Sequence, residues 1–183
     1  AYVGLEQFLE GLRSYFKKHA FGNSEFSDLL AALELASGRD DLDTWAAAWL
    51  QTSGVNTLSS EFMTDHDGTF TSFAVRQHAD PEFATLRPHR IRIGLYERDG
   101  DRIVRRHVVE TDVTGELTEV PELVGRPQPD LILLNDDDLT YAKIRLDDRS
   151  LATVRESVAT IESSLARALC WSAAWDMTRD AEL

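Results

Sequence analysis

The chain has 183 residues, enough for one domain or two small units, and its 43% apolar and 28% charged residues are typical of a globular protein. Asp and Glu number 32 against 19 Lys and Arg, giving a formal net charge of −13. This charge repels phosphate backbones and anionic lipid, and no apolar run approaches the roughly 20 residues of a spanning helix, so nucleic acid and membrane are excluded as expected partners.

The first residues of the chain show helical periodicity. Apolar residues recur every three or four positions from Leu5 to Phe16 and predict one helix. A second helix is expected with Ser24 as its cap and Gly38 as its left-handed end, and a third runs from residues 40–41 to Gly54. Short connections between the three favour antiparallel packing.

From Val55 the apolar pattern changes to alternation, which predicts antiparallel strands. Asp65-His66-Asp67-Gly68 and Asp99-Gly100 are turn signals between paired strands. The strands are expected at residues 58–63, 70–77, 91–95, 103–109, near 113, and at 117–120, 131–134 and 139–146. About seven short strands within a hundred residues indicate a β-sandwich.

Helical spacing returns after residues 147–149, with Ser150 as a candidate cap. The last segment, Leu165 to Met177, is apolar on more than one side, so burial among several neighbours is expected. Ala1-Tyr2-Val3 contains no capping side chain ahead of the first helix. Both ends lead to the expectation that the chain is cut from a larger protein.

The predicted fold class is α+β in several parts: antiparallel helices, an all-β sandwich, then helices. The expected boundaries are residues 1–54, 55–148 and 149–183.

No motif of an active site is present. Zinc hydrolases need two histidines one helical turn apart, as in HExxH, and none of the five histidines has another within four residues. They are His19, His66, His78, His89 and His107. A GxSxG elbow and a glycine-rich phosphate loop are also missing. The sequence therefore predicts no catalytic, cofactor-binding or metal-binding residue.

Several polar groups have both a functional and a structural interpretation. Asp136-Asp137-Asp138 could hold calcium, but the run is contiguous where calcium loops space their ligands, which favours a turn with solvated charges. Asp65 and Asp67 beside His66 are interpreted as turn formers in the same way.

A basic stretch and a single cysteine complete this group. Arg87, His89, Arg90 and Arg92 alternate with isoleucines as in a half-exposed strand, although the patch could instead meet an acidic neighbouring domain. Cys170 is expected to be a buried apolar residue, and a lone cysteine, which excludes an internal disulfide, favours a reducing compartment.

Ordered motifs across nearly the whole chain resemble the aminopeptidase N family of zinc metallopeptidases. The first group resembles the closing helices of that family's catalytic domain: Gly11-Leu12-Arg13-Ser14-Tyr15-Phe16, His19-Ala20-Phe21-Gly22-Asn23, Asp28-Leu29, Leu33-Glu34, Ser37-Gly38-Arg39, Trp45, Trp49, Leu50 and Gly54. The second resembles its β-sandwich domain: Leu86-Arg87-Pro88-His89, Pro129-Asp130-Leu131 and Asn135 through Lys143. The third resembles the first helices of its C-terminal helical domain: Arg167-Ala168-Leu169, Trp171, Trp175-Asp176-Met177 and Arg179 through Leu183.

This resemblance implies a function for the parent protein. The family removes N-terminal amino acids from peptides with zinc bound by HExxH and a downstream glutamate, while a tyrosine stabilises the oxyanion. The resemblance places all of these before Ala1, so none is assigned to this chain, and its tyrosines receive no catalytic role. The chain is expected to be an inactive, cytoplasmic structural fragment, a bridge, spacer or hinge without its own cofactor.

The expected partners are the rest of the parent chain and, for the parent, peptide substrates. The apolar faces of residues 5–16 and 165–175 are expected to be covered, if necessary by self-association. The alternative is a self-standing sandwich that binds a protein or a sugar. The open reading frame distinguishes these two hypotheses: one that extends upstream and contains HExxH indicates the peptidase fragment. A hydrolase built on scattered carboxylates is a third hypothesis, supported by composition alone.

Overall fold

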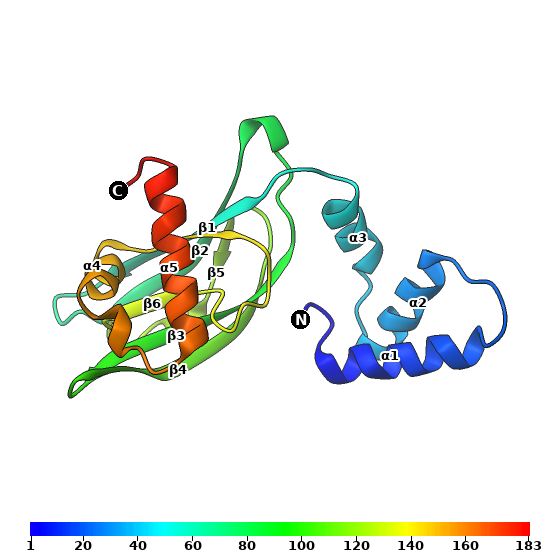
Figure 1. The fold of residues 1–183 in the computed structure, drawn as a ribbon, viewed down its shortest axis with the longest axis horizontal. Helices are drawn as coiled ribbons and strands as arrows, with labels where there is room; N and C mark the ends of the chain where they lie inside the picture. The colour runs from blue at the N-terminus through cyan, green and yellow to red at the C-terminus, as the bar shows by residue number, and fades with distance from the viewer. The chain divides into compact units, whose positions relative to one another are not determined.

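The computed structural model describes residues 1–183 and divides them into two units, Ala1–Ser53 and Gly54–Leu183. The first unit contains helices α1 (Leu5–Lys18), α2 (Phe26–Ser37) and α3 (Leu42–Leu50), labelled in Figure 1. All three expected helices are confirmed. None of the helices in either unit combines the length and apolar character of a bilayer-crossing segment.

The start of α2 corrects one prediction. Glu25, not Ser24, is the N-cap residue, and its backbone amide donates to the Asp28 carboxylate at 2.9 Å. Ser24 is instead hydrogen-bonded to the Tyr15 hydroxyl at 2.6 Å. Gly38 ends the helix in the left-handed conformation, as expected, with φ of 70°.

The core of the first unit is small and depends on one aromatic cluster. Tyr2 stacks on Trp45 at 5.6 Å between ring centroids, and the Arg39 guanidinium lies 3.8 Å above the Tyr2 ring. Arg39 also donates to both Asp41 carboxylate oxygens, at 2.8 and 2.9 Å, and these bonds are the main cause that lowers the pKa of Asp41 to about 2. The cluster ties the first residues of the chain to α3.

Gly11 allows α1 and α2 to approach closely. A Cβ atom at this position would lie 2.8 Å from Leu33 Cδ2 and 3.1 Å from the Ala32 carbonyl oxygen. The opposite face of α1 is apolar and exposed, with Leu5 at 72% and Phe16 at 66% of their full accessible areas.

We predict that Gly11→Ala destabilises the first unit by about 1–2 kcal/mol, although alanine favours helix, because the added methyl group overpacks the α1–α2 contact. Hydrogen exchange of the α1 and α2 amides measures the effect. Ser14→Ala, on the exposed side of α1, is the matched control and should be neutral or slightly stabilising. Equal protection in both variants would contradict the close approach.

The second unit contains seven strands. They are β1 (Asn56–Thr64), β2 (Phe70–Ala79), β3 (His89–Asp99), β4 (Arg102–Val113), β5 (Leu117–Glu119), β6 (Leu131–Leu134) and β7 (Lys143–Arg145). They form a four-stranded sheet of order β5-β2-β1-β7 and a three-stranded sheet of order β4-β3-β6. All pairs are antiparallel except β1 and β7, which are parallel. The α+β class with a seven-stranded sandwich is confirmed.

Two strand predictions were wrong in extent. The strand expected near Val113 is the end of β4, because β3 and β4 pair continuously from Asp99 and Arg102 to His89 and Val113. The strand expected over residues 139–146 is reduced to Lys143–Arg145, because Asn135 holds the amides of Leu139 and Thr140 in a turn.

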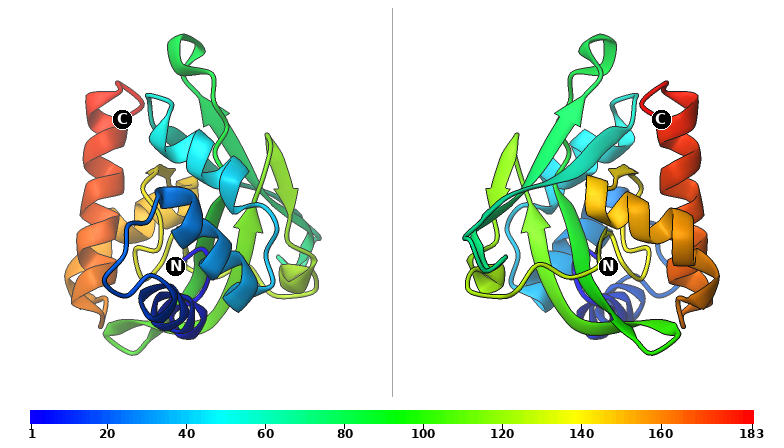
Figure 2. Two further views of the ribbon diagram at one scale, coloured as in Figure 1. Left: turned by 90° about the vertical axis from the view of Figure 1, so that its right-hand side faces the viewer. Right: turned by 90° about the vertical axis from the view of Figure 1, so that its left-hand side faces the viewer.

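Helices α4 (Asp148–Ser157) and α5 (Ser164–Arg179) lie alongside the strands, as the views in Figures 1 and 2 show. The cap of α4 is Asp147 rather than Ser150, whose hydroxyl donates to Asp147 and accepts from the Ile132 amide at 2.8 Å. Three short 3₁₀ helices occupy the connections: Pro81–Phe83, Pro121–Leu123 and Val158–Thr160.

One hydrophobic core is shared by the strands and both helices. It includes Val75 of β2, Ile93 of β3 and Leu133 of β6, and continues into Val154 of α4 and Cys170 of α5. Cys170 is fully buried, as expected, and burial raises the pKa of its thiol to about 12. The helices therefore belong to the same unit as the strands.

Candidate functional site

Polar side chains form several hydrogen bonds at the junction between β6, β7 and the two helices. The junction begins with the turn after β6, where Asn135, Asp137 and Asp138 have positive φ angles of 57°, 66° and 55°. Asn135 stabilises the turn: its Oδ1 accepts from the amides of Leu139 and Thr140, each at 3.0 Å, and its Nδ2 donates to the Thr140 carbonyl at 2.8 Å. The turn directs the chain from one sheet to the other.

The prediction that the charges of the acidic run are solvated is wrong for Asp136, which is only 1% exposed. Its carboxylate accepts from the Tyr96 hydroxyl at 2.9 and 3.0 Å and from Arg105 Nη1 at 2.9 Å. Gly94 leaves room for it, since a Cβ there would lie 2.2 Å from Asp136 Oδ2. Burial and the neighbouring charge of Asp136 raise the pKa of Tyr96, which keeps the hydroxyl protonated as a donor.

The basic stretch on β3 is paired within its own unit. Arg90 donates to both Asp112 oxygens, at 2.6 and 2.9 Å, and Arg92 donates to Glu110 at 2.9 Å and Asp137 at 2.8 Å. Arg87 is buried. The half-exposed-strand interpretation is therefore favoured over a patch that meets an acidic domain.

His89 joins the two sheets in a buried hydrogen-bonded group. Its Nε2 lies 3.3 Å from Asn56 Oδ1, and its Nδ1 lies 2.8 Å from the Thr140 hydroxyl. Because the Asn56 oxygen can only accept, Nε2 carries the proton and Nδ1 accepts from Thr140. Burial, with a smaller contribution from the Arg87 charge, lowers the pKa of His89 to about 4. The imidazole is therefore neutral near pH 7.

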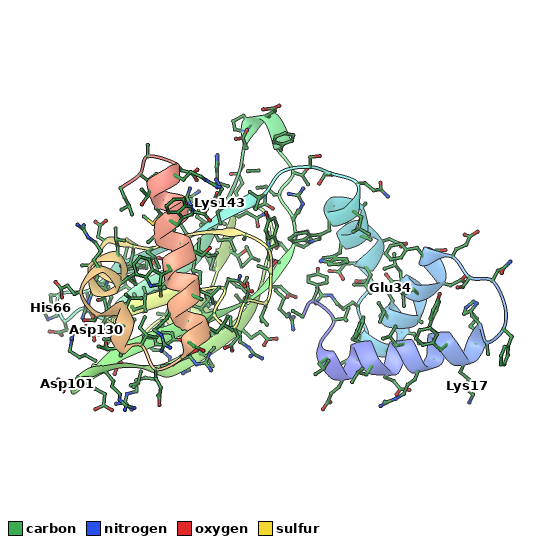
Figure 3. All side chains as sticks on the ribbon, in the orientation of Figure 1. Lys17, Glu34, His66, Asp101, Asp130 and Lys143 are labelled. Atoms are coloured by element: carbon green, nitrogen blue, oxygen red, sulfur yellow. The ribbon has the colours of Figure 1, made fainter.

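Charged side chains attach the ends of both helices to the strands. Asp180, which follows α5, accepts from Lys143 Nζ at 2.6 Å and Arg145 Nη2 at 2.5 Å, and Figure 3 shows Lys143 beside that end of the helix. Glu182 pairs with Arg145 at 2.5 Å.

A second attachment holds α4 in place. Asp130, labelled in Figure 3, accepts from the Arg98 amide at 2.7 Å and from Arg149 at 3.2 Å. Its carbonyl oxygen accepts from the Thr153 hydroxyl at 2.7 Å. These attachments could not be predicted from the sequence, because the paired residues lie far apart along the chain.

Helix α5 has one buried and one exposed face. Ala166, Cys170 and Ala173 pack into the core, whereas Trp171 and Trp175, one turn apart, are 65% and 68% exposed. Burial on several sides was expected, and within this chain only one side is covered. Together with the exposed face of α1, this leaves apolar surface in each unit.

The other candidate groups are separated or exposed. Asp65, His66 and Asp67 offer ligand atoms within 4.8 Å of one another, but all three are exposed at the tip of the β1–β2 hairpin. Asp65 Oδ1 accepts from the amides of Asp67 and Thr69 at 3.0 and 2.9 Å, so its turn-forming role is confirmed. His89 is part of the buried group described above, away from that tip.

Comparison with known proteins finds a relative that is similar to this chain over its whole length. The chain is 60% identical over 190 aligned residues to aminopeptidase N of Streptomyces lividans, an alignment that covers 100% of this chain and 22% of that relative. Over its whole length, the chain is therefore similar to one part of an aminopeptidase N. It spans about a fifth of the length of this relative.

Further comparisons cover parts of the chain or its fold. Aminopeptidase N of Lactococcus lactis is 38% identical over 64 residues, 35% of this chain and 7% of the relative. Tricorn protease-interacting factor F2 of Thermoplasma volcanium is 42% identical over 57 residues, 31% of this chain and 7% of the relative. The model of the ERAP1-like C-terminal domain family matches residues 131–183, from β6 through α5.

A solved structure shares the fold. Legionella pneumophila aminopeptidase A in complex with aspartic acid has a TM-score of 0.63 at 16% identity, over 87% of this chain and 18% of that one. The aminopeptidase N resemblance seen in the sequence motifs is confirmed.

We predict that the buried His89 makes the second unit less stable in acid. Between pH 6.5 and 4 the unfolded chain binds the proton that the folded chain excludes, so stability falls as pH drops through this window, by about 3 kcal/mol in total. Urea unfolding at pH 7 and pH 4.5 measures this loss of stability. The His89→Gln variant should lose most of the part of this pH dependence that comes from His89.

His66→Gln, at the exposed hairpin tip, controls for the loss of one histidine. An undiminished pH dependence in His89→Gln would show that the imidazole does not titrate in the proposed way.

Proposed function

We propose that this chain is a non-catalytic structural part of a zinc-dependent aminopeptidase that removes N-terminal amino acids from peptides. The observation that carries the proposal is the 60% identity over the whole chain to an aminopeptidase N. The parent's peptide substrates, its zinc and its cytoplasmic location rest on the family resemblance.

Within that parent, residues 1–54 correspond to the closing helices of the catalytic domain, 55–148 to the β-sandwich domain and 149–183 to the first helices of the C-terminal domain. The match to the ERAP1-like C-terminal domain family covers residues 131–183, so it includes the last segment but also takes in β6 and β7. The strands and α5 share one core, and Lys143 and Arg145 bind Asp180 at the end of α5. These contacts favour a sandwich that holds α5 rigidly over a hinge at residue 149.

The residues of this chain are a poor fit for a catalytic zinc. Such a site uses three protein ligands and an open position, usually with two or three imidazoles. The Asp65-His66-Asp67 group supplies a single imidazole on an exposed turn. We therefore assign the parent's zinc to residues outside this chain and derive no catalytic step here.

The rest of the parent chain is the proposed partner of the apolar helix faces. Exposed tryptophans one turn apart on α5 and the exposed stripe on α1 are suited to packing against further helices. Without these neighbours, the isolated chain is expected to self-associate through the same faces.

We predict that the purified 183-residue chain contains less than stoichiometric zinc and does not hydrolyse aminoacyl-anilides. The full-length parent should bind zinc stoichiometrically and hydrolyse these substrates. Metal analysis and a chromogenic peptidase assay measure the two properties side by side. Chelator-sensitive hydrolysis that follows the chain through successive purification steps would contradict the structural role. An open reading frame without an upstream HExxH would favour the binding-module alternative.

A further inference from the structure

A groove of about 450 Å³ crosses the outer face of the four-stranded sheet, apart from the junction described above. Its lining includes three apolar side chains from separate parts of the chain. They are Met63 of β1, Leu117 of β5, and Val124, which follows the short helix Pro121–Leu123. These side chains are 65%, 45% and 46% exposed. Three aliphatic side chains are thus held open to solvent around one depression.

Two glutamates face each other across the floor of this groove. Ala74 of β2 is paired with Glu61 of β1 on one side and with Glu119 of β5 on the other. Directly paired residues point to the same face of a sheet, and neighbouring strands lie about 4.8 Å apart, so the two glutamate backbones are roughly 10 Å apart. Ala74 between them is only 8% exposed, so its methyl group forms the floor of the groove beneath the two carboxylates.

The charges of the groove favour a cation. Glu61 accepts from Arg76 Nε at 2.5 Å, while Glu119 forms no ion pair. The only cation near the floor is therefore already bound on one side, and the chain as a whole carries a net charge of −13. A long side chain with an apolar stem and a charged end matches such a surface, because the stem packs on aliphatic groups while the charge reaches the carboxylates.

We propose that this groove binds a lysine or arginine side chain of an extended segment from a separate polypeptide. The aliphatic stem lies against Met63 and Val124, and the cationic end lies above Ala74 between Glu61 and Glu119. The interaction is weak and sensitive to salt, because both carboxylates are exposed.

Titration of the isotope-labelled chain with a capped peptide, N-acetyl-Leu-Lys-Leu-amide, tests the proposal by NMR. The expected result is saturable shifts at the amides of Met63, Ala74 and Glu119, with binding lost at high salt. N-acetyl-Leu-norleucine-Leu-amide keeps the apolar stem without the charge and should bind several-fold more weakly. Both peptides are blocked at the N-terminus, so the test does not depend on peptidase activity.

Two variants and a control complete the experiment. Glu119→Gln should weaken lysine-peptide binding about threefold, and Ala74→Arg should abolish it by placing a guanidinium between the glutamates. Glu156→Gln makes the same charge change on the exposed side of α4 and should leave binding unchanged. Unshifted strand amides outside the groove show that each variant is folded.

Three results would overturn the proposal: no saturable shifts with the lysine peptide, equal binding of the norleucine peptide, or equal losses in Glu119→Gln and Glu156→Gln.

Discussion

The turn at Asn135–Asp138 is the constraint on which the second unit depends. It takes the chain from β6, in the three-stranded sheet, to β7, which lies parallel to β1 in the four-stranded sheet. Such a turn needs left-handed backbone at non-glycine residues, which is costly unless the side chains stabilise it. Asn135 does so locally, and the buried Asp136 does so through Tyr96 and Arg105.

The same crossover determines where the helices pack. Because β7 lies at the edge of the four-stranded sheet, Lys143 and Arg145 are placed where they reach Asp180 beyond the end of α5. Asp130, just before β6, binds the backbone of β3 and the side chain of Arg149 in α4. The strands and helices therefore support one another around a single core, and α5 presents its tryptophans from a fixed base.

Local features of this fold could be predicted from sequence, and long-range ones could not. The α1 stripe, the Gly38 helix end and the Asp99-Gly100 hairpin depend on residues close together in the chain, and all three are present. Asp136 was interpreted as solvated because its neighbours are acidic, yet its partner Tyr96 is 40 positions away. Ser150 resembles a cap, but a stronger acceptor, Asp147, takes that role. Gly94 is informative only once the carboxylate beside it is known.

Native-state hydrogen exchange of the second unit tests whether α5 and the strands form one structural unit. If they do, buried α5 amides, such as those of Cys170 and Ala173, open with the same free energy as Ile93 in β3, and Asp180→Asn loosens the C-terminal turns of α5 first. A wild-type α5 that exchanges far faster than β3, through an opening of its own, would contradict a single structural unit.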